Sequence, residues 1–223
     1  MMKFFRKHAD LGITGGMARW YNKSTRNNRL EEMKAYADEA ASYLSPGQAV
    51  LEVAPGPGYM SIALAKAGDF RITGMDISQD FVDICRNNAK EAGVNADFVQ
   101  GNVSSMPFAD ETFHFIFCSA AFKNFHEPLA ALNEMYRVLK PGALALIVDS
   151  NRGISNAQRE AHLTDLGMKG LEKWFISMSF RYFLGKGAYT KDELDALAVQ
   201  SCFESHDIME KGISLFAYLR KKG

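Results

Sequence analysis

The sequence predicts an α/β fold in which a mostly parallel sheet is covered by helices on both faces. From about Ser45 onward, short β-rich runs alternate with amphipathic helical runs, and the β-rich runs are almost continuously apolar. That alternation is typical of parallel strands buried on both faces. Near the C-terminus two β-rich runs flank a short turn at Lys211-Gly212, so they must pair in the antiparallel sense.

The expected elements follow in chain order. Five runs should form the parallel strands: Gln48–Ala54, Phe70–Met75, Ala96–Gln100, Thr112–Ser119 and Ala143–Asp149. The antiparallel pair at Phe203–Met209 and Ile213–Leu219 brings the sheet to seven strands. Helices are expected at Arg29–Leu44, Tyr59–Ala67, Ser78–Ala92, Leu129–Val138 and Lys191–Gln200. Ser78 and Thr190 are suitable helix N-caps, and Lys140-Pro141-Gly142 should stop the fourth helix.

Two regions lie outside this alternation. Residues 1–44 should form an N-terminal helical cap, and residues 45–223 one main domain with a helical insertion at 151–188. Part of that insertion should pack on the sheet, but Trp174, Met178, Phe180 and Phe183 exceed what one packed helix face needs. We expect the insertion to act as a lid over an apolar small molecule, with core packing as the alternative.

Charge and cysteine content exclude several classes of protein. Lys and Arg number 26, as do Asp and Glu, which argues against a protein that mainly coats nucleic acid or an anionic membrane. The basic excess in residues 1–34 is interpreted as a solvated face. Cys85, Cys118 and Cys202 form no CxxC pair and no metal-ligand spacing, which favours reduced thiols and no metal. No signal peptide or spanning helix is apparent, so we expect a cytoplasmic protein.

The strongest chemical signal is the loop Pro55-Gly56-Pro57-Gly58, which joins a strand to a helix as nucleotide-binding loops do. Its glycines allow a sharp turn and close approach of a ligand. Glu52 ends the preceding strand, and no Lys or Arg lies between Gln48 and Lys66. A pyrophosphate would face that carboxylate without a basic partner. A cofactor with an ammonium and a sulfonium suits it better, so charge favours S-adenosylmethionine over NAD.

Two further strand ends carry polar side chains. Asp76 ends the second strand, where a carboxylate can accept both hydroxyls of an adenosine ribose. The alternative for Asp76 is a helix cap. Asn102 follows the third strand and could bond the adenine amino group, with Val103 beside the ring. A purely turn-forming Asn102 is the alternative there.

Four segments together resemble the class I S-adenosylmethionine-dependent methyltransferases, in particular the branch that includes the ubiquinone/menaquinone C-methyltransferases. They are VLEVAPGPG (50–58), MDIS (75–78), FVQGNVSSMPFADETFHFIFC (98–118) and EMYRVLKPGALALIVD (134–149). The resemblance covers about residues 45–150 and the C-terminal hairpin. It implies a Rossmann-like fold, S-adenosylmethionine as cofactor, and methyl transfer to O, N or C of a small molecule with S-adenosylhomocysteine as product.

The resemblance also implies roles for single residues. The cofactor-binding residues would be Tyr21, Glu52, Ala54, Pro55, Gly56, Gly58, Asp76, Ile77, Asn102, Val103 and Ser119. Glu52 and the loop would serve the methionine end, and Asp76 the ribose. Ile77, Asn102 and Val103 would frame adenine, and Ser119 would lie near the methyl group.

Three departures from the family pattern stand out. Ala54 replaces the usual first glycine, so the turn must accept a β-carbon. Asn102 replaces the commoner Asp and offers less charge assistance to the adenine amine. Tyr21 would close over the cofactor, yet the residue after it is Asn22 where relatives often carry Asp.

The acceptor site is expected between the N-terminal helices, the segment after the fourth strand and the insertion. Lys123 and His126 are polar candidates in Ser119–Pro128, and His126 could act as a general base. A solvated or capping His126 is the alternative, since methyl transfer needs little acid–base help. An aromatic or lipid-like acceptor, another small molecule, and a protein or nucleic acid stay open. So do a monomer or a homodimer.

Three rival functions remain at this point. A nicotinamide-dependent oxidoreductase would bind NADH. A non-catalytic cofactor-binding protein would bind the sulfur cofactor without turnover. A third rival keeps the fold and uses the cofactor for another purpose.

Overall fold

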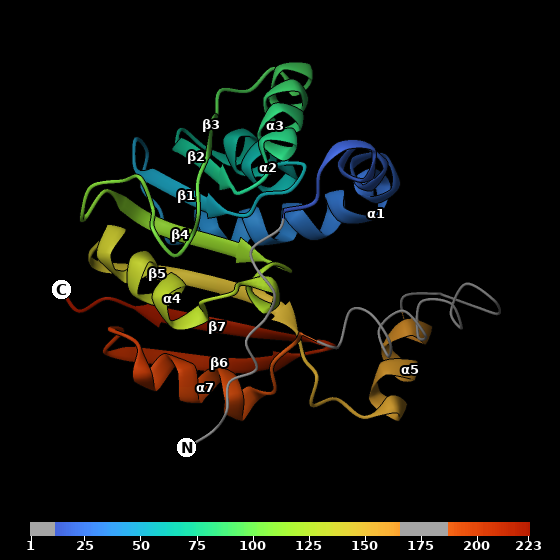
Figure 1. Ribbon diagram of the computed structural model, residues 1–223, viewed down its shortest axis with the longest axis vertical. Helices are drawn as coiled ribbons and strands as arrows, with labels where there is room; N and C mark the ends of the chain where they lie inside the picture. The colour runs from blue at the N-terminus through green and yellow to red at the C-terminus, as the bar shows by residue number, and fades with distance from the viewer. Residues whose placement is uncertain (1–11, 166–186) are drawn as a thin grey trace.

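The computed structural model describes residues 12–165 and 187–223. Its centre is a seven-stranded sheet with the strand order β3-β2-β1-β4-β5-β7-β6 (Figure 1). The strands are β1 (Ala49–Val53), β2 (Arg71–Asp76), β3 (Asp97–Gln100), β4 (Phe113–Ser119), β5 (Leu139–Ser150), β6 (Ser205–Lys211) and β7 (Ser214–Arg220). β1 to β5 run parallel, β7 runs antiparallel to β5, and β6 runs antiparallel to β7. The predicted sheet is confirmed.

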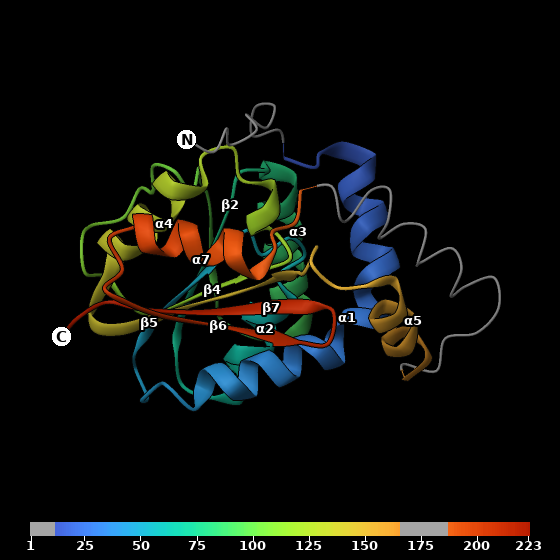
Figure 2. The ribbon, with the colours of Figure 1, turned by 90° about the horizontal axis from the view of Figure 1, so that it is seen from below.

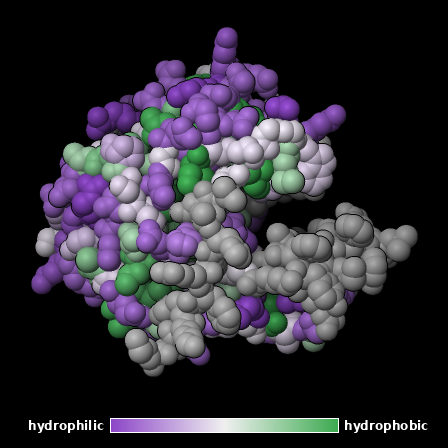
Figure 3. Space-filling view, viewed as in Figure 1, coloured by the Kyte–Doolittle hydropathy of each residue, from purple (hydrophilic) through white to green (hydrophobic). Residues whose placement is uncertain are grey.

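Helices cover both faces of the sheet (Figure 2). They are α1 (Gly15–Ala41), α2 (Tyr59–Ala67), α3 (Gln79–Ala92), α4 (Pro128–Val138), α5 (Asn156–Asp165) and α7 (Lys191–Gln200), with a 3₁₀ turn η1 (Phe122–Asn124). In Figure 2, α1 and α2 lie below the sheet, and α4 and α7 lie above it. The outer surface around α3, at the top of Figure 3, is mostly hydrophilic.

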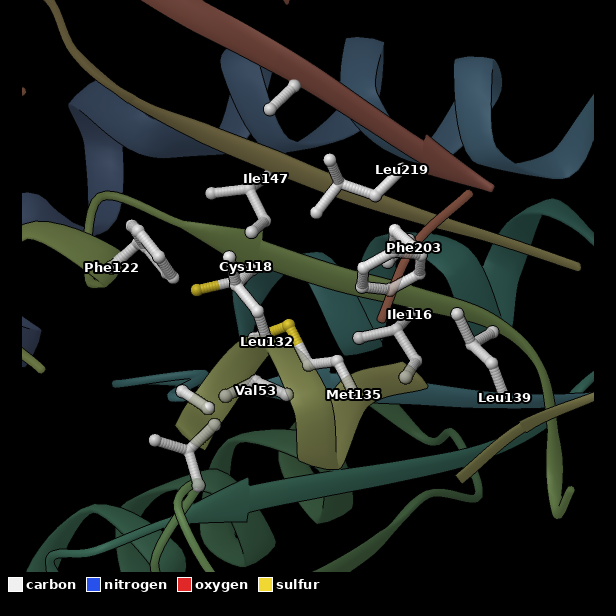
Figure 4. Close-up of a cluster of buried hydrophobic side chains, with 14 of the residues drawn as sticks. Val53, Ile116, Cys118, Phe122, Leu132, Met135, Leu139, Ile147, Phe203 and Leu219 are labelled. Atoms are coloured by element: carbon white, nitrogen blue, oxygen red, sulfur yellow. The ribbon is translucent and has the colours of Figure 1, made fainter. Parts of the chain in front are cut away.

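Two apolar cores follow from this layering. Phe115 and Phe117 of β4 face α1 and α2, whereas Ile116 and Cys118 face α4 and α7. Figure 4 shows Ile116 and Cys118 beside Leu132 of α4. Both kinds of position on β4 are completely buried, which explains why the strand is apolar without alternation.

Two element boundaries differ from the prediction. α1 begins at Gly15, inside the helical cap expected at residues 1–44 but before Arg29, where the helical pattern is clearest; its first N–H donates to the Asp80 carboxylate of α3 at 3.0 Å. β5 begins directly after α4, so Pro141 lies inside the strand. The register of the pairing between β4 and β5 shifts between Phe113 and Phe115, opposite the start of β5. The segment Lys140-Pro141-Gly142 therefore lies in an irregular part of the strand, where a proline is tolerated.

The capping box predicted at Thr190 is present, with Glu193 as its second member. Trp174, Met178, Phe180 and Phe183 lie outside the described residues, so the lid and the boundaries of the insertion stay predictions. Within residues 12–165 and 187–223, no helix has the length and apolarity that a membrane crossing requires.

Candidate active site

The carboxyl ends of the five parallel strands meet at one edge of the sheet, and chain order reverses between β1 and β4. That reversal is where open α/β sheets bind ligands. Backbone bonds tie neighbouring strand ends together at this edge: Ala54 N–H donates to Met75 O at 2.8 Å, and Gly101 N–H to Asp76 O at 3.0 Å. The strands therefore bring Ala54, Asp76 and Gly101 to one surface.

The loop after β1 is built from left-handed backbone. φ is +54° at Ala54, +54° at Gly56 and +79° at Gly58. Ala54 thus holds the strained conformation expected where relatives carry glycine. At Gly58 a β-carbon would lie 3.0 Å from Sγ of Cys85, so both the backbone and its surroundings require glycine.

Asp76 connects this loop to the end of β2. Its Oδ2 accepts from Gly56 N–H at 3.2 Å, and its Oδ1 accepts from Ser78 N–H at 2.9 Å. The side chain is buried, which raises the pKa of the carboxyl, and the two N–H donors oppose that rise. Asp76 therefore lies at the loop as predicted, whereas the N-cap of α3 is Ser78, whose side chain accepts from Phe81 N–H.

Glu52 lies on the opposite side of the loop, buried at the end of β1. Its Oε2 accepts from the backbone N–H of Ser61 at 2.9 Å and from the Ser61 hydroxyl at 2.5 Å. Ser61 stands in the first turn of α2, where a carboxylate is favoured by the helix dipole. Glu52 therefore holds the loop against α2 through direct side-chain bonds.

Two side chains of α3 support the loop, and the sequence analysis missed both. Cys85 Sγ donates to Gly56 O at 2.9 Å, and Asn88 Nδ2 donates to Pro57 O at 2.8 Å. Both are buried on the face of α3 that also carries Phe81 and Val82. A polar Asn88 in that otherwise apolar periodicity was the available signal.

The electrostatic field at the loop is negative. Burial raises the pKa of the Cys85 thiol well above its usual value, and the charges of Glu52 and Asp76 raise it further. Two carboxylates within reach of one loop fit a ligand with positive groups and donating hydroxyls. These two carboxylates therefore suit S-adenosylmethionine, with its sulfonium, ammonium and ribose hydroxyls, better than a pyrophosphate.

Tyr21 of α1, predicted to close over the cofactor, lies against the loop. Its Cε1 would be 4.0 Å from a β-carbon at Gly56, and its ring meets Phe81 of α3 edge-on at 5.9 Å between centroids. The next residue, Asn22, faces α2 and α3, where its Oδ1 accepts from Tyr59 Oη at 2.8 Å and from Asn88 Nδ2 at 3.1 Å. Asn22 thus anchors α1 while Tyr21 covers the loop.

The predicted adenine side lies beyond Asp76. Ile77 is half-buried and touches the segment before α1, since a β-carbon at Gly12 would lie 3.0 Å from its Cγ2. Asn102 Oδ1 accepts from Ser104 N–H at 2.9 Å, which is the turn-forming bond given above as its alternative. Val103 is buried beside it. An amide oxygen has two lone pairs, so this turn leaves the adenine contact of Asn102 untested.

The predicted acceptor side begins where β4 ends. Ser119 is half-buried at the strand end, and His126 is half-buried between η1 and α4. Lys123, a predicted polar candidate for the acceptor site, is buried. Its ammonium forms a buried ion pair with Asp149 of β5 at 2.7 Å. The structure thus places Ser119, Lys123 and His126 in the one segment after β4.

Comparisons with known proteins agree with this geometry. Residues 50–142 match the methyltransferase domain family. A demethylmenaquinone methyltransferase of Chlorobaculum parvum is 34% identical over 100 residues, which is 45% of this chain and 40% of that protein. A ubiquinone/menaquinone biosynthesis C-methyltransferase of Legionella pneumophila is 35% identical over 112 residues, which is 48% of this chain and 45% of that protein. The match thus spans less than half of these relatives.

A solved structure extends the similarity to the whole fold. An S-adenosylmethionine-dependent methyltransferase from Aquifex aeolicus superposes with a TM-score of 0.69 and 21% identity, covering 91% of this chain and 97% of that one. This likeness shows the fold, and the sequence matches cover less than half of the chain. The strand-end carboxylate, the left-handed loop and the matched segment agree: residues 50–142 are similar to the methyltransferase domain family, and the fold is the one seen in S-adenosylmethionine-dependent methyltransferases of known structure.

Proposed function

We propose that this protein transfers the methyl group of S-adenosylmethionine to an O, N or C nucleophile of a small, hydrophobic or aromatic acceptor. The observation that carries the proposal is the pairing of Asp76 with the glycine loop, opposite the buried Glu52. The names of the relatives support an acceptor of quinone type. The rival oxidoreductase gains no support, because its pyrophosphate would meet two carboxylates.

Each residue has a proposed role in this reaction. The cofactor supplies a methyl group on a sulfonium, which is a good leaving group. Asp76 would accept the ribose hydroxyls, and Glu52 with Gly56 and Gly58 would hold the methionine end. Tyr21 would close over the cofactor from α1, and Ser119 would line the methyl side. In this proposal most of the rate enhancement comes from in-line positioning of the acceptor.

The adenine contacts and the base are also part of the proposal. Ile77, Asn102 and Val103 would frame the adenine ring, with Ala54 and Pro55 shaping the loop. His126 would take an acceptor proton where the nucleophile carries one. The proposal further includes a cytoplasmic protein without a nucleic-acid partner, as a monomer or homodimer, and a lid in the insertion.

An acceptor screen tests the activity. The protein would be incubated with S-adenosylmethionine and a panel of reduced naphthoquinones, phenols and amines, and S-adenosylhomocysteine formation would be measured. We expect turnover with at least one hydrophobic aromatic compound, and none with Asp76→Ala. Binding of the sulfur cofactor without turnover on any acceptor would instead support the non-catalytic rival.

A further inference from the structure

One buried charge pair stands beside the site and is not used by the proposed reaction. Lys123 Nζ donates to Asp149 Oδ1 at 2.7 Å and to Ala120 O at 2.7 Å. The backbone N–H of Lys123 donates to Asp149 Oδ2 at 2.8 Å. The side chains are 8% and 4% exposed. A single lysine therefore ties the turn after β4 to the end of β5 through two bonds to Asp149, and a third bond, to Ala120 O, braces the turn itself.

Stability alone is a poor explanation for this pair. Removing two charges from water costs about as much as their attraction returns, so apolar residues would serve a core equally well. The turn is also strained, since Ala120 has φ +55° without being glycine. Strain held in place by a network of bonds is typical of segments whose geometry matters for function.

The position of the pair indicates which geometry it controls. Ala120 follows Ser119, the residue proposed to lie near the methyl group, and Asp149 stands just before the insertion that begins at residue 151. The acceptor is expected between these two segments. The loop contacts of Glu52 and Asp76 involve Ser61, Gly56 and Ser78, none of which touches the pair through a described bond. The two halves of the site thus have separate supports.

We propose that Lys123 and Asp149 are positioning residues that fix the turn after β4 and thereby place the acceptor, without setting cofactor affinity. This inference rests on the proposed methyl transfer. The pair acts through the turn that begins at Ala120 and takes no part in bond making. Its loss should therefore loosen the acceptor side while the cofactor side stays intact.

The chemical accessibility of two buried thiols, Cys118 and Cys85, can be used to follow the acceptor side and the cofactor side separately. Cys118 is completely buried, and Phe122 of η1 lies directly beside its sulfur (Figure 4). Movement of the turn would expose Cys118, whereas Cys85 lies behind the glycine loop. The variant Lys123→Met/Asp149→Asn removes both charges and keeps an oxygen for the N–H of residue 123. Labelling with N-ethylmaleimide, followed by peptide mass spectrometry, gives the rate at each cysteine.

Lys221→Met is the matched control. Lys221 is also a buried lysine that donates to a backbone carbonyl, that of Leu139 at 2.8 Å, but at the far end of β5. It should lower the melting temperature without changing the turn. Lys123→Arg keeps the charge and should restore part of the wild-type behaviour. It also provides a milder test in case the double variant folds poorly.

In the double variant we expect Cys118 labelling to rise by about tenfold or more. Cys85 labelling and the affinity for S-adenosylhomocysteine should stay within about threefold. With the acceptor from the screen, kcat/KM for the acceptor should fall by about tenfold to a hundredfold while KM for S-adenosylmethionine is unchanged. Lys221→Met should change none of these values.

Three results would overturn the inference. One is unchanged Cys118 labelling, another is an equal loss of acceptor and cofactor affinity, and the third is the same pattern in Lys221→Met. A wild-type protein that turns over no acceptor would count against the proposed function instead. The labelling and affinity measurements would then still decide whether the pair fixes the turn independently of the cofactor loop.

Discussion

The phenol oxygen of Tyr59 in α2 lies 2.8 Å from the side-chain oxygen of Asn22 in α1 and 2.7 Å from its backbone carbonyl oxygen, so the two acceptors share its one proton. This double contact holds the half of α1 that carries Tyr21 over the glycine loop. The side-chain oxygen of Asn22 also accepts a hydrogen bond from Asn88 Nδ2. Asn88 Nδ2 in turn donates to Pro57 O in the glycine loop. The side-chain amide of Asn22 therefore links α1, through Asn88, to the glycine loop.

Tyr59→Phe should loosen this junction. We expect it to lower the free energy of unfolding by about 1 kcal/mol, the net value of a buried hydrogen bond, in urea titrations. It should also speed hydrogen exchange in the first half of α1 and weaken S-adenosylhomocysteine binding. Tyr43→Phe, at the exposed end of the cap, is the control. Equal exchange in the two variants would contradict the coupling.

Acid should weaken cofactor binding through Asp76. Burial raises the pKa of this carboxyl, and only the ionised form accepts hydrogen bonds at both oxygens. As the pH falls, affinity for S-adenosylhomocysteine should therefore drop at a higher pH than for an ordinary aspartate. Asp76→Asn should bind weakly and lose this dependence, as calorimetry over a pH series would show. An identical pH profile in the two proteins would count against the assignment.

The effect of pH on folding stability through Asp76 is opposite to its effect on cofactor binding. The pKa of Asp76 is higher in the folded protein than in the unfolded chain, so its ionisation opposes folding. The contribution of Asp76 to stability is thus present at low pH and is lost as the pH rises through the raised pKa. A buried carboxylate whose ionisation lowers the stability of the fold is more typical of a binding residue than of a structural one.

Alanine substitutions at Gly47 and Gly58 allow the cost of backbone strain to be measured separately from the cost of a steric clash. Gly47 and Gly58 both have φ +79°, but a β-carbon at Gly47 meets nothing within 4 Å, whereas one at Gly58 lies 3.0 Å from Cys85 Sγ. Gly47→Ala should cost about 1 kcal/mol from backbone strain. Gly58→Ala should cost about 1–3 kcal/mol more through the clash and should abolish cofactor binding. Equal unfolding free energies would show that the loop tolerates the side chain.

Much of the cofactor side could be predicted from local sequence. Glu52 and Asp76 end apolar strands, and parallel strands bring their carboxyl ends to one edge. The glycine loop also predicts a sharp turn, and the structure builds that turn from left-handed backbone at Gly56 and Gly58. These positions could be predicted because each depends on a few neighbouring residues and on strand direction, whereas the ligand contacts of Glu52 and Asp76 stay predictions.

The missed features depend on contacts between distant segments. Lys123 and Asp149 are 26 positions apart, and neither residue type signals the other. Asn88 contacts Pro57 across 31 positions. The first N–H of α1, at Gly15, donates to Asp80, which lies 65 positions further along the chain. Side-chain partners of this kind follow from packing, which a single sequence does not specify.

Calorimetric binding of S-adenosylhomocysteine tests the central claim most directly. The wild type should bind with micromolar affinity and give no heat with NADH. Asp76→Ala should lose the binding, whereas Asp97→Ala, which removes an exposed carboxylate at the start of β3, should retain it. Failure of the wild type to bind the sulfur ligand, or equal binding by the two variants, would contradict the account.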